Sequence, residues 1–86
     1  MKMDARITSI LGKEKVKAFA SVLLEDKFLI RGIKIVDGSR GRFVAMPARR
    51  TKKGDFADIC FPITPETRTE INDAVLTAYA KKLEEM

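Results

Sequence analysis

The chain has 86 residues, of which 45% are hydrophobic and 34% charged, with a formal net charge of +5. This composition is typical of a folded globular protein, and no apolar run approaches the roughly 20 residues that cross a bilayer. One cysteine and no histidine exclude an intrachain disulfide and a zinc site. We therefore expect a single cytoplasmic domain over residues 1–86, with no cofactor, no membrane contact and no small-molecule substrate.

The small size also predicts a partner chain. A domain of this length buries only about 60–65% of the surface of its unfolded chain, so its stability margin is thin without a staple. Since neither a disulfide nor a metal can supply one, a second copy of the chain is the expected source of additional buried area. We expect a homodimer.

The N-terminal half alternates apolar and polar residues. A short strand is predicted over residues 7–11 and a turn over residues 12–15. Residues 16–24 then alternate at period two. One face of this strand carries Val16, Ala18, Ala20, Val22 and Leu24, and the other carries Lys17, Phe19, Ser21 and Leu23.

A second turn is predicted at residues 25–27, before a strand over residues 28–36 that is rich in β-branched side chains. The apolar positions change parity within it, because Ile30 lies on one parity and Ile33 on the other. A β-bulge at Gly32 would return both to one face. A glycine-rich turn at residues 37–41 follows.

The C-terminal half predicts two more strands and a helix. A strand over residues 42–46 ends at Pro47, and another covers residues 55–61; we expect these two to pair as a hairpin. Thr64 is a suitable helix N-cap, Pro65 suits the first turn, and an apolar stripe predicts a helix over about 65–84. The stripe consists of Ile71, Val75, Ala78, Tyr79 and Leu83. The predicted fold is α+β: a meandering antiparallel sheet of about five strands followed by one helix.

Charge is concentrated in the middle of the chain. Residues 31–54 hold eight of the 17 basic residues and one of the 12 acidic residues, whereas residues 55–86 are net acidic. The densest part places four cations in five positions: Arg49, Arg50, Lys52 and Lys53. A polyanion such as nucleic acid is the simplest partner for such a surface. Arginine can read guanine in a groove while lysine mainly contacts phosphate, so we expect any base contact from Arg49 and Arg50.

The sequence around this basic segment has a specific pattern. It reads Val36-Asp37-Gly38-Ser39-Arg40-Gly41-Arg42-Phe43-Val44-Ala45-Met46-Pro47, then Arg49-Arg50-Thr51, then Gly54-Asp55-Phe56. This pattern resembles that of the stage V sporulation protein G (SpoVG) family, and the likeness extends from Asp4-Ala5-Arg6 to about Tyr79. Where family members often have Thr-Pro-Asp-Gly, this chain has Thr51-Lys52-Lys53-Gly54. Where they often have Ala-His-Pro, it has Cys60-Phe61-Pro62.

The resemblance implies a homodimeric regulator of gene expression that binds DNA, and in some members RNA, in sporulation and septation-type processes. It implies no enzymatic activity, and association with the nucleoid would follow from DNA binding. By resemblance, Arg49 and Arg50 make the nucleic-acid contact. The rival interpretation is a protein-interaction module that acts on cell division through an acidic protein partner.

Other candidate residues have structural alternatives. Arg40 and Arg42 can extend the basic patch, while Arg31 and Lys34 are interpreted as solvated strand positions. Asp55 and Asp58 are expected to balance the neighbouring arginines, and Cys60 is expected to be buried and inert. The aromatic side chains Phe43, Phe56 and Phe61 are either stacking platforms for single-stranded bases or core residues, and we expect the core.

Overall fold

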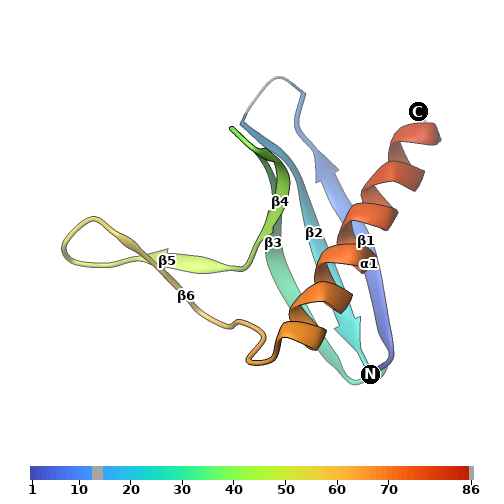
Figure 1. The fold of residues 1–86 in the computed structure, drawn as a ribbon, viewed down its shortest axis with the longest axis horizontal. Helices are drawn as coiled ribbons and strands as arrows, with labels where there is room; N and C mark the ends of the chain where they lie inside the picture. The colour runs from blue at the N-terminus through green and yellow to red at the C-terminus, as the bar shows by residue number, and fades with distance from the viewer. Residues whose placement is uncertain (13–14, 86) are drawn as a thin grey trace.

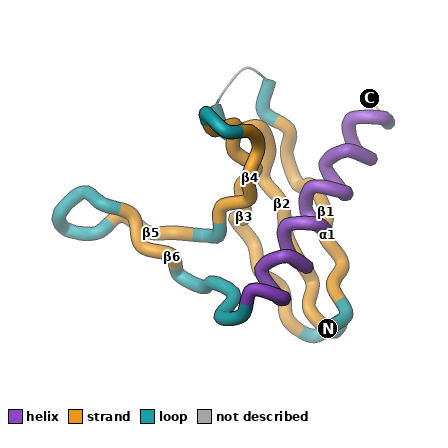
Figure 2. The backbone as a smooth tube through the Cα atoms, viewed as in Figure 1, coloured by secondary structure: helices purple, strands orange, loops and turns teal. Residues whose placement is uncertain are grey.

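The chain forms a four-stranded sheet, a separate two-stranded ribbon and one helix in the computed structural model, which describes residues 1–12 and 15–85 (Figure 1). Strands β1 (Met3–Ile10), β2 (Val16–Leu24), β3 (Phe28–Gly38) and β4 (Gly41–Ala45) pair antiparallel in chain order. Strands β5 (Ala48–Arg50) and β6 (Phe56–Asp58) pair only with each other. Helix α1 (Pro65–Glu84) lies across one face of the larger sheet (Figure 2).

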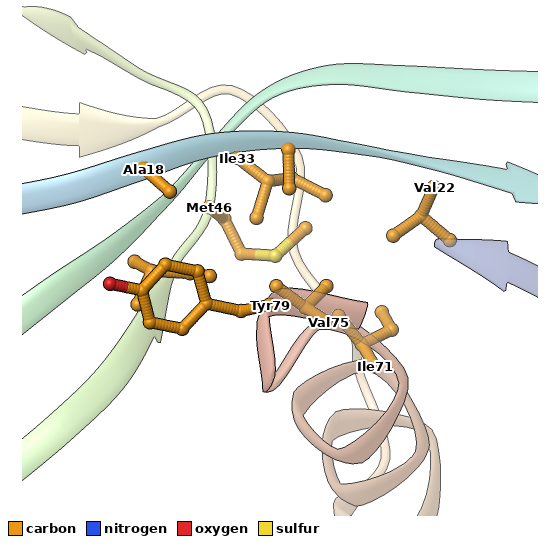
Figure 3. Packing of buried hydrophobic residues seen from close by; sticks show 9 residues of the cluster. Ala18, Val22, Ile33, Met46, Ile71, Val75 and Tyr79 are labelled. Carbon is orange, nitrogen blue, oxygen red and sulfur yellow. The ribbon is translucent and has the colours of Figure 1, made fainter. Parts of the chain in front are cut away.

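The core lies between this face of the sheet and α1. Side chains that alternate along β2 and β3 meet one side of the helix, and Figure 3 shows Met46 lying among them. The buried cluster consists of Ala18, Ala20, Val22, Ile33, Ile35, Met46, Ile71, Val75 and Tyr79. The period-two alternation of β2 is confirmed from Ala18 to Leu24, but a register shift between Val16 and Ala18 leaves Val16 outside the core. In the helical stripe Ile71, Val75 and Tyr79 are buried, whereas Ala78 lies outside the buried cluster and Leu83 is 41% exposed. The predicted short first strand instead begins at Met3, because Met3, Ala5 and Ile7 pack against this core.

Helix α1 has the predicted bounds and the predicted cap. The N–H of Thr67 donates to Oγ1 of Thr64 at 3.1 Å, and Thr64 itself has an extended backbone. Pro65 occupies the first turn, where its missing N–H costs no intrahelical hydrogen bond. Glu66 lies in the first turn and two lysines lie in the last, which suits the helix dipole.

The predicted bulge at Gly32 is confirmed. Ala20 pairs with Ile33 and Val22 with Ile30, so Arg31 and Gly32 together oppose the single residue Ser21. Gly32 has a φ of +78°, a conformation that glycine adopts without the steric cost of a Cβ.

The prediction of one five-stranded sheet is wrong, and Pro47 gives the reason. Strand β4 ends at Ala45, which pairs with Lys34; further along, Pro47 has no N–H to donate to the ladder. The bulge at Gly32 lies beside it, since a Cβ on Gly32 would be 3.7 Å from the Cβ of Pro47. Pairing between β3 and β4 therefore stops there, and the next strand leaves the sheet.

The turns are as predicted where the structure describes them. Glu25 and Asp26 both have positive φ values, and the N–H of Lys27 donates to the carbonyl oxygen of Leu24. Leu24 pairs with Phe28, so the turn spans residues 25–27 as predicted. Gly38 and Gly41 pair at the tight β3–β4 turn. The turn predicted at residues 12–15 includes positions 13 and 14, which lie outside the described residues.

Candidate nucleic-acid interface

Residues 48–58, hereafter the arm, form a β-hairpin that projects away from the sheet and helix (Figure 1). Ala48, Arg49 and Arg50 pair with Asp58, Ala57 and Phe56 respectively. The pairing is continued at the base, where the N–H of Ile59 donates to the carbonyl oxygen of Pro47 at 2.7 Å. The expected hairpin of residues 42–47 with 55–61 is thus replaced by a shorter one that starts after Pro47.

The tip of the arm is a tight turn with two lysines. The N–H of Gly54 donates to the carbonyl oxygen of Thr51. The N–H of Thr51 in turn donates to the carbonyl oxygen of Asp55. Gly54 has a φ of +89°. This is the three-residue hairpin loop in which a type I turn ends in a left-handed residue. Its central positions tolerate most residues, so Lys52 and Lys53 fit there.

Arg49 and Arg50 lie in β5 rather than in the turn. Because successive strand residues point to opposite faces, the two arginines lie on different sides of the arm. The guanidinium carbon of Arg50 is 5.8 Å from the centre of the Phe56 ring, within cation–π range. Arg49 is opposite Ala57. The two arginines proposed to contact bases therefore lie on opposite faces of the arm.

The four cations of the arm form no ion pair among the described residues. All four arm cations are exposed, and none takes part in the ion pairs found among residues 1–12 and 15–85. The expectation that Asp55 and Asp58 balance the arginines is wrong: Asp58 lies opposite Ala48, while Asp55 accepts a hydrogen bond at its backbone carbonyl. The arm therefore presents four cations and two carboxylates to solvent, a formal net charge of +2 (four minus two).

Arg40 and Arg42 lie elsewhere, at the β3–β4 turn, which is the opposite end of β4 from the arm (Figure 1). Nε of Arg42 donates to Oδ1 of Asp37 at 3.0 Å, and its guanidinium carbon is 5.1 Å from the centre of the Tyr79 ring. These contacts hold the Arg42 side chain against the helix-covered face. Arg40 is exposed. The structure therefore separates the six candidate cations into an arm group and a turn group.

The prediction that the phenylalanines belong to the core is also wrong. Phe43 is 49% exposed, Phe56 70% and Phe61 57%. Phe43 alternates with Arg42 and Val44 on β4, so it points to the face that the helix does not cover, and Phe56 lies on the arm. Cys60 is half-buried and packs against the core rather than lying inside it.

The return from the arm to the helix carries apolar residues that sequence reasoning missed as a surface. Ile59 is 65% exposed and Ile63 88%, and both flank the exposed Phe61. Pro62 was the feature of the sequence that could have indicated their exposure, because a proline interrupts a strand. Without strand pairing, nothing in the sequence assigns these side chains to a buried face. With Phe56 on the arm, residues 56–63 thus expose four large apolar side chains, hereafter the apolar surface, of which Phe61 and Ile63 line one hollow.

The described residues contain neither a metal-binding group nor a membrane-spanning helix. Within residues 1–12 and 15–85, no group of three or more His, Cys, Asp or Glu side chains could hold a metal ion. In the same part of the chain, α1 is too polar to span a membrane.

A model of the SpoVG family matches residues 1–81. The chain belongs to the SpoVG family. Curated relatives from three bacteria are named "Putative septation protein SpoVG". The chain is 51% identical over 76 residues to that of Desulforudis audaxviator, covering 88% of this chain and 86% of the relative. It is 43% identical over 82 residues to that of Clostridium botulinum strain Alaska E43, covering 95% and 90%.

The Bacillus cytotoxicus relative is 42% identical over 85 residues, with 96% and 88% covered. These names refer to septation, and none names a reaction. The resemblance drawn from the residues around the basic segment is thereby confirmed at the level of the family.

Proposed function

We propose that this protein binds nucleic acid, chiefly DNA with RNA as a second ligand, as a homodimeric regulator of gene expression in sporulation and septation-type processes. The observation that carries the proposal is the arm, which holds four exposed cations without a partner among the described ion pairs. Such a surface gains free energy by releasing condensed counterions from phosphate. We place the principal contact there.

The shape of the arm supports contact with a duplex. A two-stranded β-ribbon fits the major groove, which is about 12 Å wide. Lys52 and Lys53 at the tip would contact phosphates, and an arginine from β5 would reach base edges. Arg40 and Arg42, at the far end of β4, are secondary candidates, and the ion pair of Arg42 with Asp37 makes Arg42 the weaker one.

The homodimer is supported by the apolar surface beside the arm. Exposed apolar patches on a protein surface mark interaction sites. Phe61 and Ile63 line one hollow, and they and Phe56 are each more than half exposed. A second copy covering them would bury this area and bring two basic arms into one assembly. Two arms double the number of phosphate contacts, which steepens the dependence of affinity on salt.

The test is a salt titration of binding to a duplex DNA with the variant Lys52→Ala/Lys53→Ala, which removes the two expected phosphate contacts of the arm tip. Each phosphate contact contributes about 0.9 to the slope of log K against log salt concentration. Loss of two contacts per subunit should therefore flatten the slope by about 1.8 per arm and weaken binding at low salt.

The matched control is Lys27→Ala/Lys81→Ala, which removes the same charge from two exposed positions away from the arm. If the control weakens binding as much as the arm variant, the contact reflects net charge and the assignment to the arm is wrong. Wild-type binding that does not respond to salt would contradict the function itself.

A second candidate is a protein-interaction module that acts in septation through an acidic partner. The exposed apolar residues next to the arm cations favour it, because apolar contacts with a charged rim are typical of protein interfaces. It predicts weak, sequence-independent DNA binding. It also predicts a partner that is retained after nuclease treatment and lost in Phe56→Ser/Ile63→Ser.

A further inference from the structure

The four-stranded sheet has a second face that α1 does not cover. The helix contacts the sheet from one side, and the arm strands contact mainly each other, so no described element packs on the other side (Figure 2). Alternation places Phe19 and Ser21 of β2 on this uncovered face, because Ala18, Ala20 and Val22 face the core. Lys34 and Arg31 of β3 lie beside them.

Two bulges flank the same short stretch of β2. On one side Ile7 pairs with Ala20 and Ser9 with Phe19, which leaves Thr8 as an extra residue in β1. On the other side Arg31 and Gly32 together oppose Ser21. Bulges bend a sheet locally and are frequent beside functional sites. Here they occur on both neighbours of residues 19–21.

A hollow of about 330 Å³ lies at this point. It is lined by one aromatic ring, one guanidinium and three hydroxyl groups, from Phe19, Arg31, Thr8, Ser9 and Ser21. Its volume falls in the range of about 300–1,000 Å³ that is common for small-ligand pockets. An aromatic ring offers a stacking surface, the hydroxyls can donate or accept hydrogen bonds, and the guanidinium can stack or bind phosphate.

The charge around the hollow is positive. Arg31 lines it and Lys34 pairs across from Phe19, and neither takes part in the ion pairs of residues 1–12 and 15–85. Asp4 is the only carboxylate that strands β1–β4 place on this face, and it is already paired with Arg6 at 3.4 Å. Asp37, the other strand carboxylate, pairs with Arg42 on the helix side.

We propose that this hollow binds an unstacked base of single-stranded nucleic acid. The base stacks on Phe19, its edge bonds the serine and threonine hydroxyls, and Arg31 and Lys34 contact the adjoining phosphates. Single-stranded polynucleotide satisfies all three lining chemistries at once, because its bases are free to leave the stack and meet aromatic and guanidinium groups. A duplex does not, because its bases are stacked and paired.

The same face offers a second stacking surface. Phe43, on β4, is 49% exposed and pairs with Val36 of β3. It is therefore two strands away from Phe19, which lies on β2. Lys34 pairs with Phe19 on one side and with Ala45 on the other, so Phe43 lies two residues along β4 from the position across from Phe19. With strands about 4.8 Å apart, the two rings are therefore more than about 10 Å apart on this face. A strand of nucleic acid that crosses the sheet would place successive bases on Phe19 and Phe43. This contact is independent of the arm and holds even if the arm binds no duplex.

The test compares the affinities of Phe19→Leu/Arg31→Gln for a 12-nucleotide oligouridine, the matching oligothymidine and a 20-base-pair duplex. Leucine keeps the apolar volume of Phe19 but removes the stacking ring, so the fold is retained. Losing one stacked base costs on the order of tenfold in affinity. We expect a loss of about that size for one or both single strands and less than about a twofold change for the duplex.

The matched control is Lys27→Gln/Phe28→Leu, which also removes one positive charge and one aromatic ring, but at the exposed β2–β3 turn, and should leave all three affinities unchanged. The arm variant Arg49→Ala/Arg50→Ala should instead weaken the duplex most. An independent readout needs no substitution: ultraviolet cross-linking of wild-type protein to oligouridine, followed by trypsin and mass spectrometry. The cross-link should appear on the peptide Ala18–Lys27, which carries Phe19.

Three outcomes would overturn the proposal. The first is wild-type single-strand affinity in Phe19→Leu/Arg31→Gln, or an equal loss for the duplex. The second is cross-linking confined to peptides of the arm. The third is a fall in oligomeric mass of this variant by analytical ultracentrifugation, which would show that a second copy of the chain covers the face.

Discussion

The helix-covered sheet and the arm are both antiparallel β-structure, but they treat their apolar side chains in opposite ways. Ile33 and Ile35 in the sheet are fully buried, whereas Phe56 on the arm is 70% exposed and Ile63 at its return is 88% exposed. Apolar burial is the main source of folding stability, so stability resides in the sheet and helix. The arm contributes little to it and instead offers charge and apolar surface to other molecules.

Truncating a side chain in each region gives the largest contrast. Ile33→Ala should lower the free energy of unfolding by about 2–5 kcal/mol, since it leaves a cavity in the core. Phe56→Ala should change it by less than about 0.5 kcal/mol, as is usual for surface positions. Urea unfolding at low protein concentration, where the chain is monomeric, measures both. A cost for Phe56→Ala that grows with protein concentration would instead indicate that a second copy covers the arm.

Within the arm, the two arginines should differ. Arg49 shares its face with Ala57, whereas Arg50 shares its face with Phe56 and the carboxylate of Asp58, which repels phosphate. Arg49→Lys keeps the charge but loses the bidentate fork, so it should reduce discrimination between preferred and unrelated duplexes by about 1–3 kcal/mol. Arg50→Lys should leave discrimination nearly unchanged. Competition binding with a selected and a scrambled duplex measures this discrimination for each variant. Equal losses in Arg49→Lys and Arg50→Lys would contradict the predicted difference between the two arginines.

The smallest contrast uses one substitution at two glycines with positive φ. Gly32→Ala forces alanine into a left-handed conformation within the main sheet and should lower the free energy of unfolding by about 1 kcal/mol. Gly54→Ala imposes similar strain at the tip of the arm. Because the arm adds little to global stability, the thermal midpoint should fall for Gly32→Ala and stay constant for Gly54→Ala. Equal shifts would mean that the arm unfolds together with the sheet.

The sequence predicted the parts of the fold that local chemistry decides. Thr64, Pro65 and the three-to-four-residue apolar spacing identify α1 within its observed bounds, and the parity change around Gly32 locates the bulge. The departure of the arm was not predicted, because a strand pattern on both sides of Pro47 reads the same whether or not the two strands share a sheet. Only the tertiary contact between Pro47 and the bulged β3 separates them.

The candidate site was predicted in composition but not in arrangement. The cations of residues 49–53 were identifiable from charge density alone, whereas their division between strand and tip depends on where the turn begins. The hollow beside Phe19 needed more: Thr8, Ser21 and Arg31 are brought together by two bulges on different strands. Arg31 on its own resembles any solvated strand residue.

Cleavage at the exposed tip of the arm would divide the chain into two fragments that remain packed together. Trypsin cuts after lysine and arginine, and an exposed turn with such residues is a preferred point of cleavage. A cut at Lys52 or Lys53 leaves β1–β4 on one fragment and α1 on the other, yet Ile35 and Val75 hold the fragments in one core. The two halves should therefore assemble when produced as separate chains. Protection of the tip from trypsin reports directly on whatever binds the arm.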